Sequence, residues 1–94
     1  MIKSFKCKES QKLFRLEKSA KISSTIQRVA LRKLEMIDSA VELNDLKVPP
    51  ANRLEALKGS RKGQYSIRIN DQWRVCFEWE RGDAFNVEIV DYHQ

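Results

Sequence analysis

The sequence predicts an α+β domain in which two helices cover one face of an antiparallel sheet. In residues 24–45 apolar side chains recur every three or four positions, the period of a helix with one buried face. In residues 65–90 apolar and polar residues alternate in three short runs separated by turn residues, the pattern of a three-strand meander. Neither layer can bury its apolar side alone, so we expect the helices to pack on the sheet.

The N-terminal third predicts one strand and one helix. In residues 1–5, MIKSF, Ile2 and Phe5 bracket Lys3 and Ser4, which favours a short strand that joins the sheet. Residues 9–19, ESQKLFRLEKS, place apolar side chains among charged ones and predict a short helix.

The helix that begins at Ser24 has the strongest signal in the chain. Ser24 and Gln27 have the spacing of a capping box at its start, and Asn44 and Asp45 mark its end. Its apolar stripe consists of Ile26, Ala30, Leu34, Ile37 and Val41.

Residues 46–64, LKVPPANRLEALKGSRKGQ, predict a loop. Pro49 and Pro50 exclude a helix or a central strand, and the stretch KGSRKG, which contains Gly59 and Gly63, carries three cations. The stretch NRLEAL has the composition for a short turn of helix within this loop.

The meander is predicted at residues 65–69, 73–79 and 85–90, with turns at Asn70-Asp71 and Gly82-Asp83. Each strand has one apolar face for the core and one polar face for solvent. The apolar face comprises Tyr65, Ile67, Ile69, Trp73, Val75, Phe77, Trp79, Phe85, Val87 and Ile89. The exposed face should carry Arg68, Arg74, Glu78 and Glu88.

Length and composition indicate one domain, residues 1–94, in the cytoplasm. No apolar run has the roughly 18 residues of a membrane span, and the N-terminus lacks the apolar region of a signal peptide. Cys7 and Cys76 are far apart and form no CxxC motif, so we expect reduced thiols and neither a disulfide framework nor a zinc site.

Charge is distributed unevenly along the chain. Residues 1–63 carry 15 basic and 7 acidic groups, a net charge of +8, whereas residues 64–94 carry 3 basic and 6 acidic groups, a net charge of −3. This asymmetry favours a nucleic-acid partner over an ordinary solvated surface.

The usual catalytic motifs are absent: the sequence has no P-loop, GxGxxG, HExxH or GxSxG. With one histidine, we expect no metal cluster and no cofactor. Metal-free RNA cleavage needs a base for the 2′-OH, an acid for the leaving 5′-oxygen and cations for the phosphorane. The candidates are His93, Glu55, Tyr92, Asp91, Lys58, Arg61, Lys62 and Arg74. Each of them also has an ordinary structural explanation as an exposed or half-buried side chain.

Three segments together resemble the HigB/GraT toxins of the RelE-like superfamily. They are MIKSF, LKGSRKGQYSIRINDQWRVCFEW and VEIVDYH, so the resemblance spans essentially the whole chain in order. The combination of LKGxRxG, NxxWR and a terminal DYH is specific, although each piece alone is weak.

The resemblance implies a small α+β toxin that cleaves mRNA on the ribosome by metal-free 2′-OH attack. The products would be a 2′,3′-cyclic phosphate and a 5′-hydroxyl. It also implies a cognate helix-turn-helix antitoxin, with operator DNA contacted only through that antitoxin, and no membrane partner.

Site residues are implied position by position. The lysine of LKG matches Lys58, the arginine of NxxWR matches Arg74, and the terminal triplet matches Asp91, Tyr92 and His93. Many HigB toxins have a histidine where this chain has Glu55. Two interpretations stay open: Glu55 is the general base, or this branch is a weaker or altered nuclease.

The resulting hypothesis gives each residue a role. His93 is the general acid and Glu55 the base, while Lys58 and Arg74 stabilise the phosphorane. Tyr92 orients or stacks on a nucleotide, and Asp91 orients a neighbouring group. Contacts with ribosomal RNA are expected from Arg61, Lys62, Arg28, Arg32 and Lys33.

Two rival functions belong to other classes. One is a ParE-like inhibitor that binds gyrase, and the other is a non-catalytic nucleic-acid-binding module in which His93 has no special role. The DYH ending and Lys58 argue against the first, because a gyrase inhibitor needs no acid–base pair.

Overall fold

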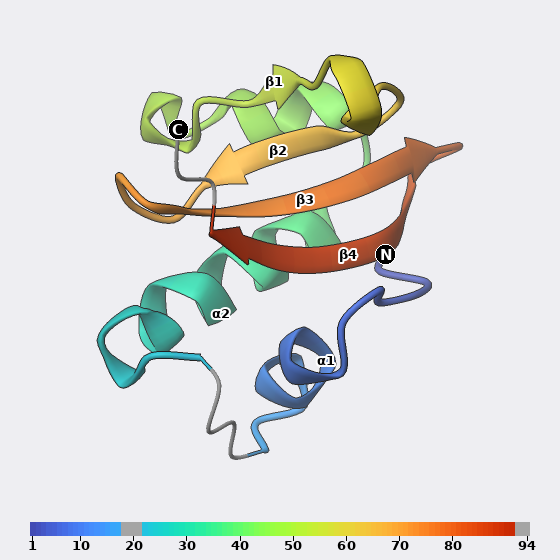
Figure 1. The fold of residues 1–94 in the computed structure, drawn as a ribbon. Helices are drawn as coiled ribbons and strands as arrows, with labels where there is room; N and C mark the ends of the chain where they lie inside the picture. The colour runs from blue at the N-terminus through green and yellow to red at the C-terminus, as the bar shows by residue number, and fades with distance from the viewer. Residues whose placement is uncertain (18–21, 92–94) are drawn as a thin grey trace.

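The computed structural model describes residues 1–17 and 22–91 and shows a helical layer packed on a four-strand antiparallel sheet (Figure 1). The α-helices are α1 (Lys8–Phe14) and α2 (Ser24–Ser39). The strands are β1 (Glu55–Ala56), β2 (Tyr65–Arg68), β3 (Trp73–Glu80) and β4 (Asp83–Asp91), in the spatial order β1-β2-β3-β4. Three 3₁₀ helices, η1 (Leu43–Lys47), η2 (Pro50–Asn52) and η3 (Gly59–Arg61), lie between α2 and β2. The predicted α+β class and meander are confirmed.

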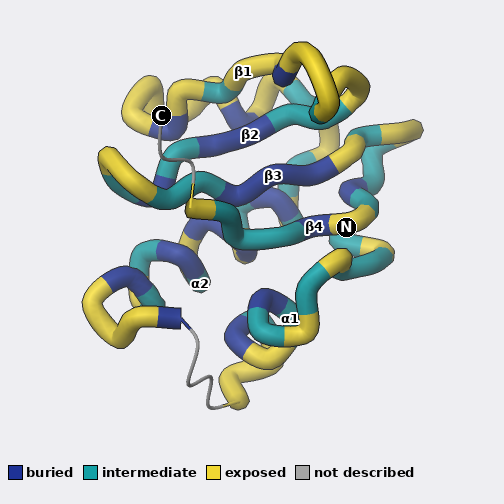
Figure 2. The backbone as a smooth tube through the Cα atoms, in the orientation of Figure 1, coloured by how far each residue is buried: buried dark blue, intermediate teal, exposed yellow. Residues whose placement is uncertain are grey.

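The core lies between α2 and the apolar face of the sheet. The stripe residues Ile26, Ala30, Leu34 and Ile37 are buried, and they share one cluster with Ile67, Val75, Phe77 and Val87 of the sheet. Figure 2 shows the buried residues concentrated in β2, β3 and the helix sides that face them, with exposed residues in the loops around β1. Within residues 1–17 and 22–91, α1 and α2 leave the opposite face of the sheet uncovered by an α-helix.

The N-terminal segment lies beside β4, but it forms two isolated parallel bridges instead of the predicted strand. These bridges join Ile2 to Ala84 and Phe5 to Val87. The backbone N–H of Ile2 also donates to the Asp38 carboxylate of α2 at 2.9 Å, which ties the segment to the helical layer. No described helix is long and apolar enough to cross a membrane.

An irregularity in β4 overturns the predicted orientation of Phe85. Cys76 pairs with Glu88, but Glu78 pairs with Phe85, so β4 has one extra residue at this point. Asn86 has φ of +53°, which is typical of a bulge. The bulge changes the alternation, so Ala84 is buried in the core cluster and Phe85 is not part of it.

Both predicted helices end earlier in the structure. The first spans Lys8–Phe14, and residues 18 and 19 of the predicted helix lie outside the described residues. The second ends at Ser39, so Val41 lies beyond it and is 76% exposed instead of completing the stripe. Its N-cap is Ser23, not Ser24, and the Ser23 hydroxyl accepts from the backbone N–H of Thr25 at 3.3 Å.

The loop at 46–64 contains a strand where a turn of helix was expected. Within NRLEAL, Glu55 and Ala56 form β1 and pair with Ser66 and Tyr65. This short edge strand lacks the alternating pattern that would have predicted it. It brings residues 55–58 alongside β2 and so onto the sheet.

Candidate active site

A row of four side chains crosses the face of the sheet that no helix covers. Glu55, Ser66, Cys76 and Glu88 are successive cross-strand partners in β1, β2, β3 and β4. Direct partners point to the same face, and this face alternates with the one that contributes Ile67 and Val75 to the core. The row therefore defines a polar face with acidic groups at both ends.

Arg74 lies on this polar face, two residues before Cys76, and its guanidinium is held in a fixed position. The Nε–H donates to Ser66 Oγ at 2.7 Å, and Nη2 donates to the backbone carbonyl of Arg53 at 2.6 Å. The same Nη2 lies 3.7 Å from Oε1 of Glu55. The Arg74 side chain is only 12% exposed, whereas that of Glu55 is 52% exposed. Arg74 therefore lies on the predicted face of the sheet, but these contacts cover most of its side chain instead of leaving it exposed.

Glu55 and Lys58 belong to one short segment, residues 55–58, which runs beside β2. Glu55 belongs to β1, and the segment remains attached to β2 at Leu57, whose N–H donates to the carbonyl of Gln64 at 2.9 Å. Lys58 follows at once, and its side chain is exposed at the start of η3. The structure thus brings Glu55 and Arg74 together and places Lys58 three residues from Glu55.

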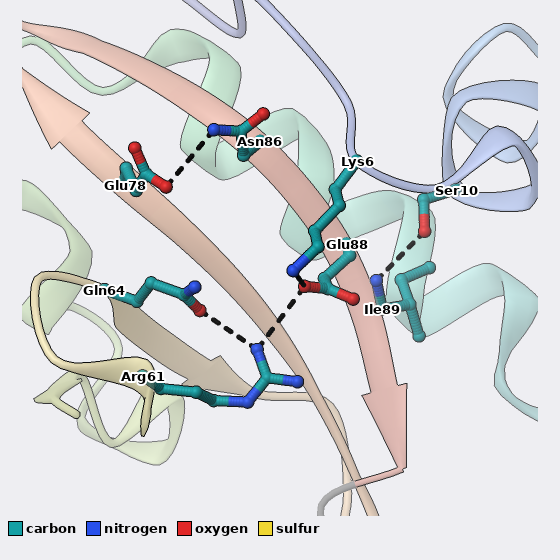
Figure 3. A network of polar contacts seen from close by, with 8 residues as sticks. All are labelled: Lys6, Ser10, Arg61, Gln64, Glu78, Asn86, Glu88 and Ile89. Atoms are coloured by element: carbon teal, nitrogen blue, oxygen red, sulfur yellow. Dashed lines mark hydrogen bonds and ion pairs between the residues drawn. The ribbon is translucent and has the colours of Figure 1, made fainter. Parts of the chain in front are cut away.

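Glu88 holds two distant segments across the polar face. Its Oε2 lies 3.4 Å from Nη1 of Arg61 in η3 and 3.6 Å from Nζ of Lys6 in the N-terminal segment. Arg61 Nη1 also donates to Oε1 of Gln64 at 3.0 Å (Figure 3). Glu88, like Arg74, is therefore more buried than the sequence pattern predicts.

Cys76 lies fully buried in the middle of the row. Burial raises the pKa of the Cys76 thiol. Neighbouring charges have smaller effects: Arg61 lowers this pKa and Glu88 raises it. Cys7 and Cys76 are both free thiols, as expected. Among the residues that the structure describes, no group of three or more His, Cys, Asp or Glu side chains could hold a metal ion.

The C-terminal residues of the predicted site are only partly described. Asp91 is the last residue of β4, pairs with Trp73 and accepts from Nε2 of Gln72 at 3.0 Å. Its neighbour Val90 pairs with Arg74, so the end of β4 lies beside the Arg74 strand. Tyr92 and His93 lie outside the described residues.

The five predicted RNA-binding cations do not form one surface. Arg28 and Arg32 are exposed on α2, in the helical layer, whereas Lys62 is exposed beside η3. Arg61 is paired with Glu88. Lys33 is 8% exposed, and its Nζ donates to Oδ1 of Asn52 at 2.6 Å, so it is not a surface cation.

An apolar hollow of about 400 Å³ lies between the two helices and apart from the polar face. Its lining includes Leu13 and Leu16 from the α1 side and Gln27 and Leu31 from α2. The candidate site is thus an open polar surface and not this hollow.

The arrangement of two helices on a four-strand antiparallel sheet also occurs in solved structures. Two structures of YafQ from E. coli, one from strain BL21(DE3) and one of a mutant, share the fold with a TM-score of 0.59. Each is 15% identical and the match covers 97% of this chain and 91% of YafQ, which establishes the fold alone.

Sequence comparison establishes the family. The chain belongs to the family of RelE-like toxins of type II toxin–antitoxin systems, HigB, whose model matches residues 3–93. It is 45% identical over 73 residues to Toxin HigB-1 of Vibrio cholerae, covering 78% of this chain and 76% of that protein. It is also 36% identical over 94 residues to Endoribonuclease HigB of Proteus vulgaris, covering 99% of this chain and all of that protein. An antitoxin partner goes with membership of this family.

Proposed function

We propose that this chain is an endoribonuclease that cuts ribosome-bound mRNA without a metal ion and thereby inhibits translation and growth. The observation that supports it most directly is the Glu55–Arg74 pair on the open polar face, 3.7 Å apart. A second support is the full-length similarity to a protein named as an endoribonuclease. A carboxylate beside a fixed guanidinium suits 2′-OH attack, because one takes the proton and the other stabilises the charge that develops.

The positions of the two groups suit a single phosphate. A phosphate oxygen that binds Nη2 of Arg74 lies beside the Glu55 carboxylate, since those two groups are already in contact range. The anion would replace Glu55 as the partner of Arg74, which leaves the carboxylate able to accept the 2′-OH proton. Lys58 adds a second cation from the same segment.

The remaining roles belong to the C-terminus. His93 protonates the leaving 5′-oxygen, Tyr92 orients or stacks on a nucleotide, and Asp91 orients a neighbouring group. β4 ends at Asp91, and its neighbour Val90 pairs with Arg74 of β3. Tyr92 and His93 follow Asp91 directly in the sequence. Exposed Lys62, Arg28 and Arg32 supply salt-dependent contacts with ribosomal RNA, and Arg61 would have to exchange Glu88 for a phosphate to do the same.

Two substitutions test the acid and the base. We expect Glu55→Gln and His93→Ala each to slow the cleavage of ribosome-bound mRNA by roughly 10²–10⁴-fold, the usual contribution of a general acid or base. Glu80→Gln is the matched control, because Glu80 is an exposed carboxylate at the end of β3 and should leave the rate unchanged.

The same experiment separates the rival functions. A His93→Ala protein that arrests growth as fully as wild type while mRNA stays intact would favour a gyrase inhibitor or a non-catalytic binding module. Wild-type cleavage by Glu55→Gln would remove Glu55 from the mechanism and leave the altered-nuclease interpretation.

We further propose that this chain acts in the cytoplasm and is neutralised by a helix-turn-helix antitoxin. The complex of the two proteins would contact operator DNA through the antitoxin. Co-expression with the protein encoded by the neighbouring gene should restore growth and yield a stable complex. Growth arrest that persists when both proteins are present would contradict this partner.

A further inference from the structure

The orientation of Arg74 depends on a backbone carbonyl as well as on side chains. Nη2 donates to the carbonyl of Arg53 at 2.6 Å, a shorter distance than its 3.7 Å separation from Glu55. Arg53 has φ of +46°, a left-handed conformation that turns the chain between η2 and β1. Whatever fixes this turn therefore contributes, together with Ser66, to where the guanidinium points.

Asn52 immediately precedes this turn and is completely buried. Its Nδ2 donates to the carbonyls of Leu46 at 3.1 Å and Val48 at 3.4 Å, which closes the loop through η1 and η2. Its Oδ1 accepts from Lys33 of α2 at 2.6 Å. Both donors and the acceptor of the amide are thus used, and they leave one side-chain orientation available.

Lys33 connects this loop to the helical layer. It extends from α2, packed on the core side, and its ammonium group donates to Oδ1 of Asn52. The contacts form a continuous path from Lys33 to Asn52, along the chain to the Arg53 carbonyl, and from there to Arg74. The path crosses from the helical side of the sheet to its polar face.

We infer that Lys33 and Asn52 are positioning residues that orient the Arg74 guanidinium through the carbonyl of Arg53. Lys33 is thereby assigned a role within the protein in place of the predicted contact with ribosomal RNA. Only the activity measurement below rests on the proposed nuclease function, because the orientation of Arg74 can be observed directly.

The direct test is ¹H–¹⁵N NMR of the arginine side chains in the purified full chain, with the Arg74 signals assigned by their loss in Arg74→Lys. In wild type we expect a distinct Nε–H signal and slowly exchanging Nη2 protons. Lys33→Met and Asn52→Asp should shift the first and lose the second, whereas Lys47→Met, at an exposed position in η1, should change neither. Lys33→Met removes the bond from Lys33 to Asn52 but retains the bonds from Asn52 Nδ2 to Leu46, Val48 and Met36. It therefore tests the positioning role even if Asn52→Asp does not fold.

The second readout is a double-mutant cycle on single-turnover cleavage of ribosome-bound mRNA. Lys33→Met should slow cleavage by roughly tenfold to a hundredfold with unchanged ribosome affinity, since displacing a catalytic group by about 1 Å costs about a hundredfold. In an Arg74→Lys background the same change should have no further effect, because coupled residues are not additive.

Two results would overturn the inference: Arg74 signals in folded Lys33→Met that superimpose on those of wild type, or fully additive effects in the cycle. If the wild-type protein does not cleave RNA, the proposed function fails, and the NMR measurement alone then decides the positioning role.

Discussion

At the residue scale, the position of Arg74 depends on a backbone carbonyl and on two neighbouring side chains. Glu55 and Arg74 are both candidates from the sequence, and the structure brings them within 3.7 Å. The Arg53 carbonyl that holds Arg74 could not be predicted, because neither a backbone acceptor nor the left-handed turn at Arg53 has a sequence signal here. The sequence does not indicate the burial of Lys33 either, because a lysine on a helix is ordinarily exposed and its buried partner Asn52 is 19 positions away.

Arg74→Lys tests whether geometry or charge matters at this position. Lysine keeps the positive charge but cannot reproduce the Nε–H bond to Ser66 together with the two contacts of Nη2. We expect cleavage of ribosome-bound mRNA to fall by about 10²–10³-fold, the usual cost of losing one preorganised donor. Arg81→Lys, at the exposed β3–β4 turn, is the control, and an equal rate for both variants would contradict a specific role for the guanidinium.

Lys33→Met should change how stability depends on pH. Burial, with smaller contributions from the Arg32 and Arg68 charges, lowers the pKa of Lys33 in the folded protein below its ordinary value of 10.5. Between the lowered pKa and 10.5 the unfolded chain holds this proton and the folded chain releases it, so wild type gains stability as pH rises through that window.

Lys33→Met has no ammonium group to titrate at this position, so it does not gain stability from it as pH rises. Urea unfolding of both proteins from neutral pH to the ordinary lysine pKa should show wild type becoming more stable relative to Lys33→Met as pH increases. A difference in unfolding free energy that stays constant across the range would contradict a lowered pKa for Lys33.

At the element scale, the long periodic segments were predicted well and the short irregular ones were not. The stripe of α2 and the strands β2 and β3 follow their hydrophobic period, which depends on burial against one core. β1 has two residues, too few to show any period, and the bulge at Asn86 breaks the alternation in β4. β1 supplies Glu55, so the element hardest to predict is also one that builds the site.

Ser10→Ala tests how α1 is attached to the sheet. The Ser10 hydroxyl is fully buried and accepts from the backbone N–H of Ile89 in β4 at 2.9 Å (Figure 3). Alanine leaves that N–H without its acceptor, which should cost about 1–3 kcal/mol of unfolding free energy. We expect a decrease in melting temperature of several degrees, measured by circular dichroism, with Ser60→Ala at an exposed position of η3 as the control. Equal melting temperatures for both variants would show that the bond does not secure α1.

At the scale of the whole molecule, the core lies on one face of the sheet and the candidate site on the other. The helical face buries the core, and the polar face carries a half-exposed Glu55 beside a largely covered Arg74. Most cations of the sequence lie outside the meander. The sequence does not show that Arg61 pairs with an acid of β4, or that Lys33 is buried. Charge counts describe a chain, whereas pairing depends on which strands become neighbours.

The central claim is that the polar face cleaves RNA by 2′-OH attack, with its own side chains as acid and base. Its most direct test is to map the ends of the mRNA fragments that the purified protein produces on programmed ribosomes. We expect fragments that end in a 2′,3′-cyclic phosphate and begin with a 5′-hydroxyl, and that are nearly absent with Glu55→Gln. Intact mRNA, or fragments that carry a 5′-phosphate and a 3′-hydroxyl, would contradict it.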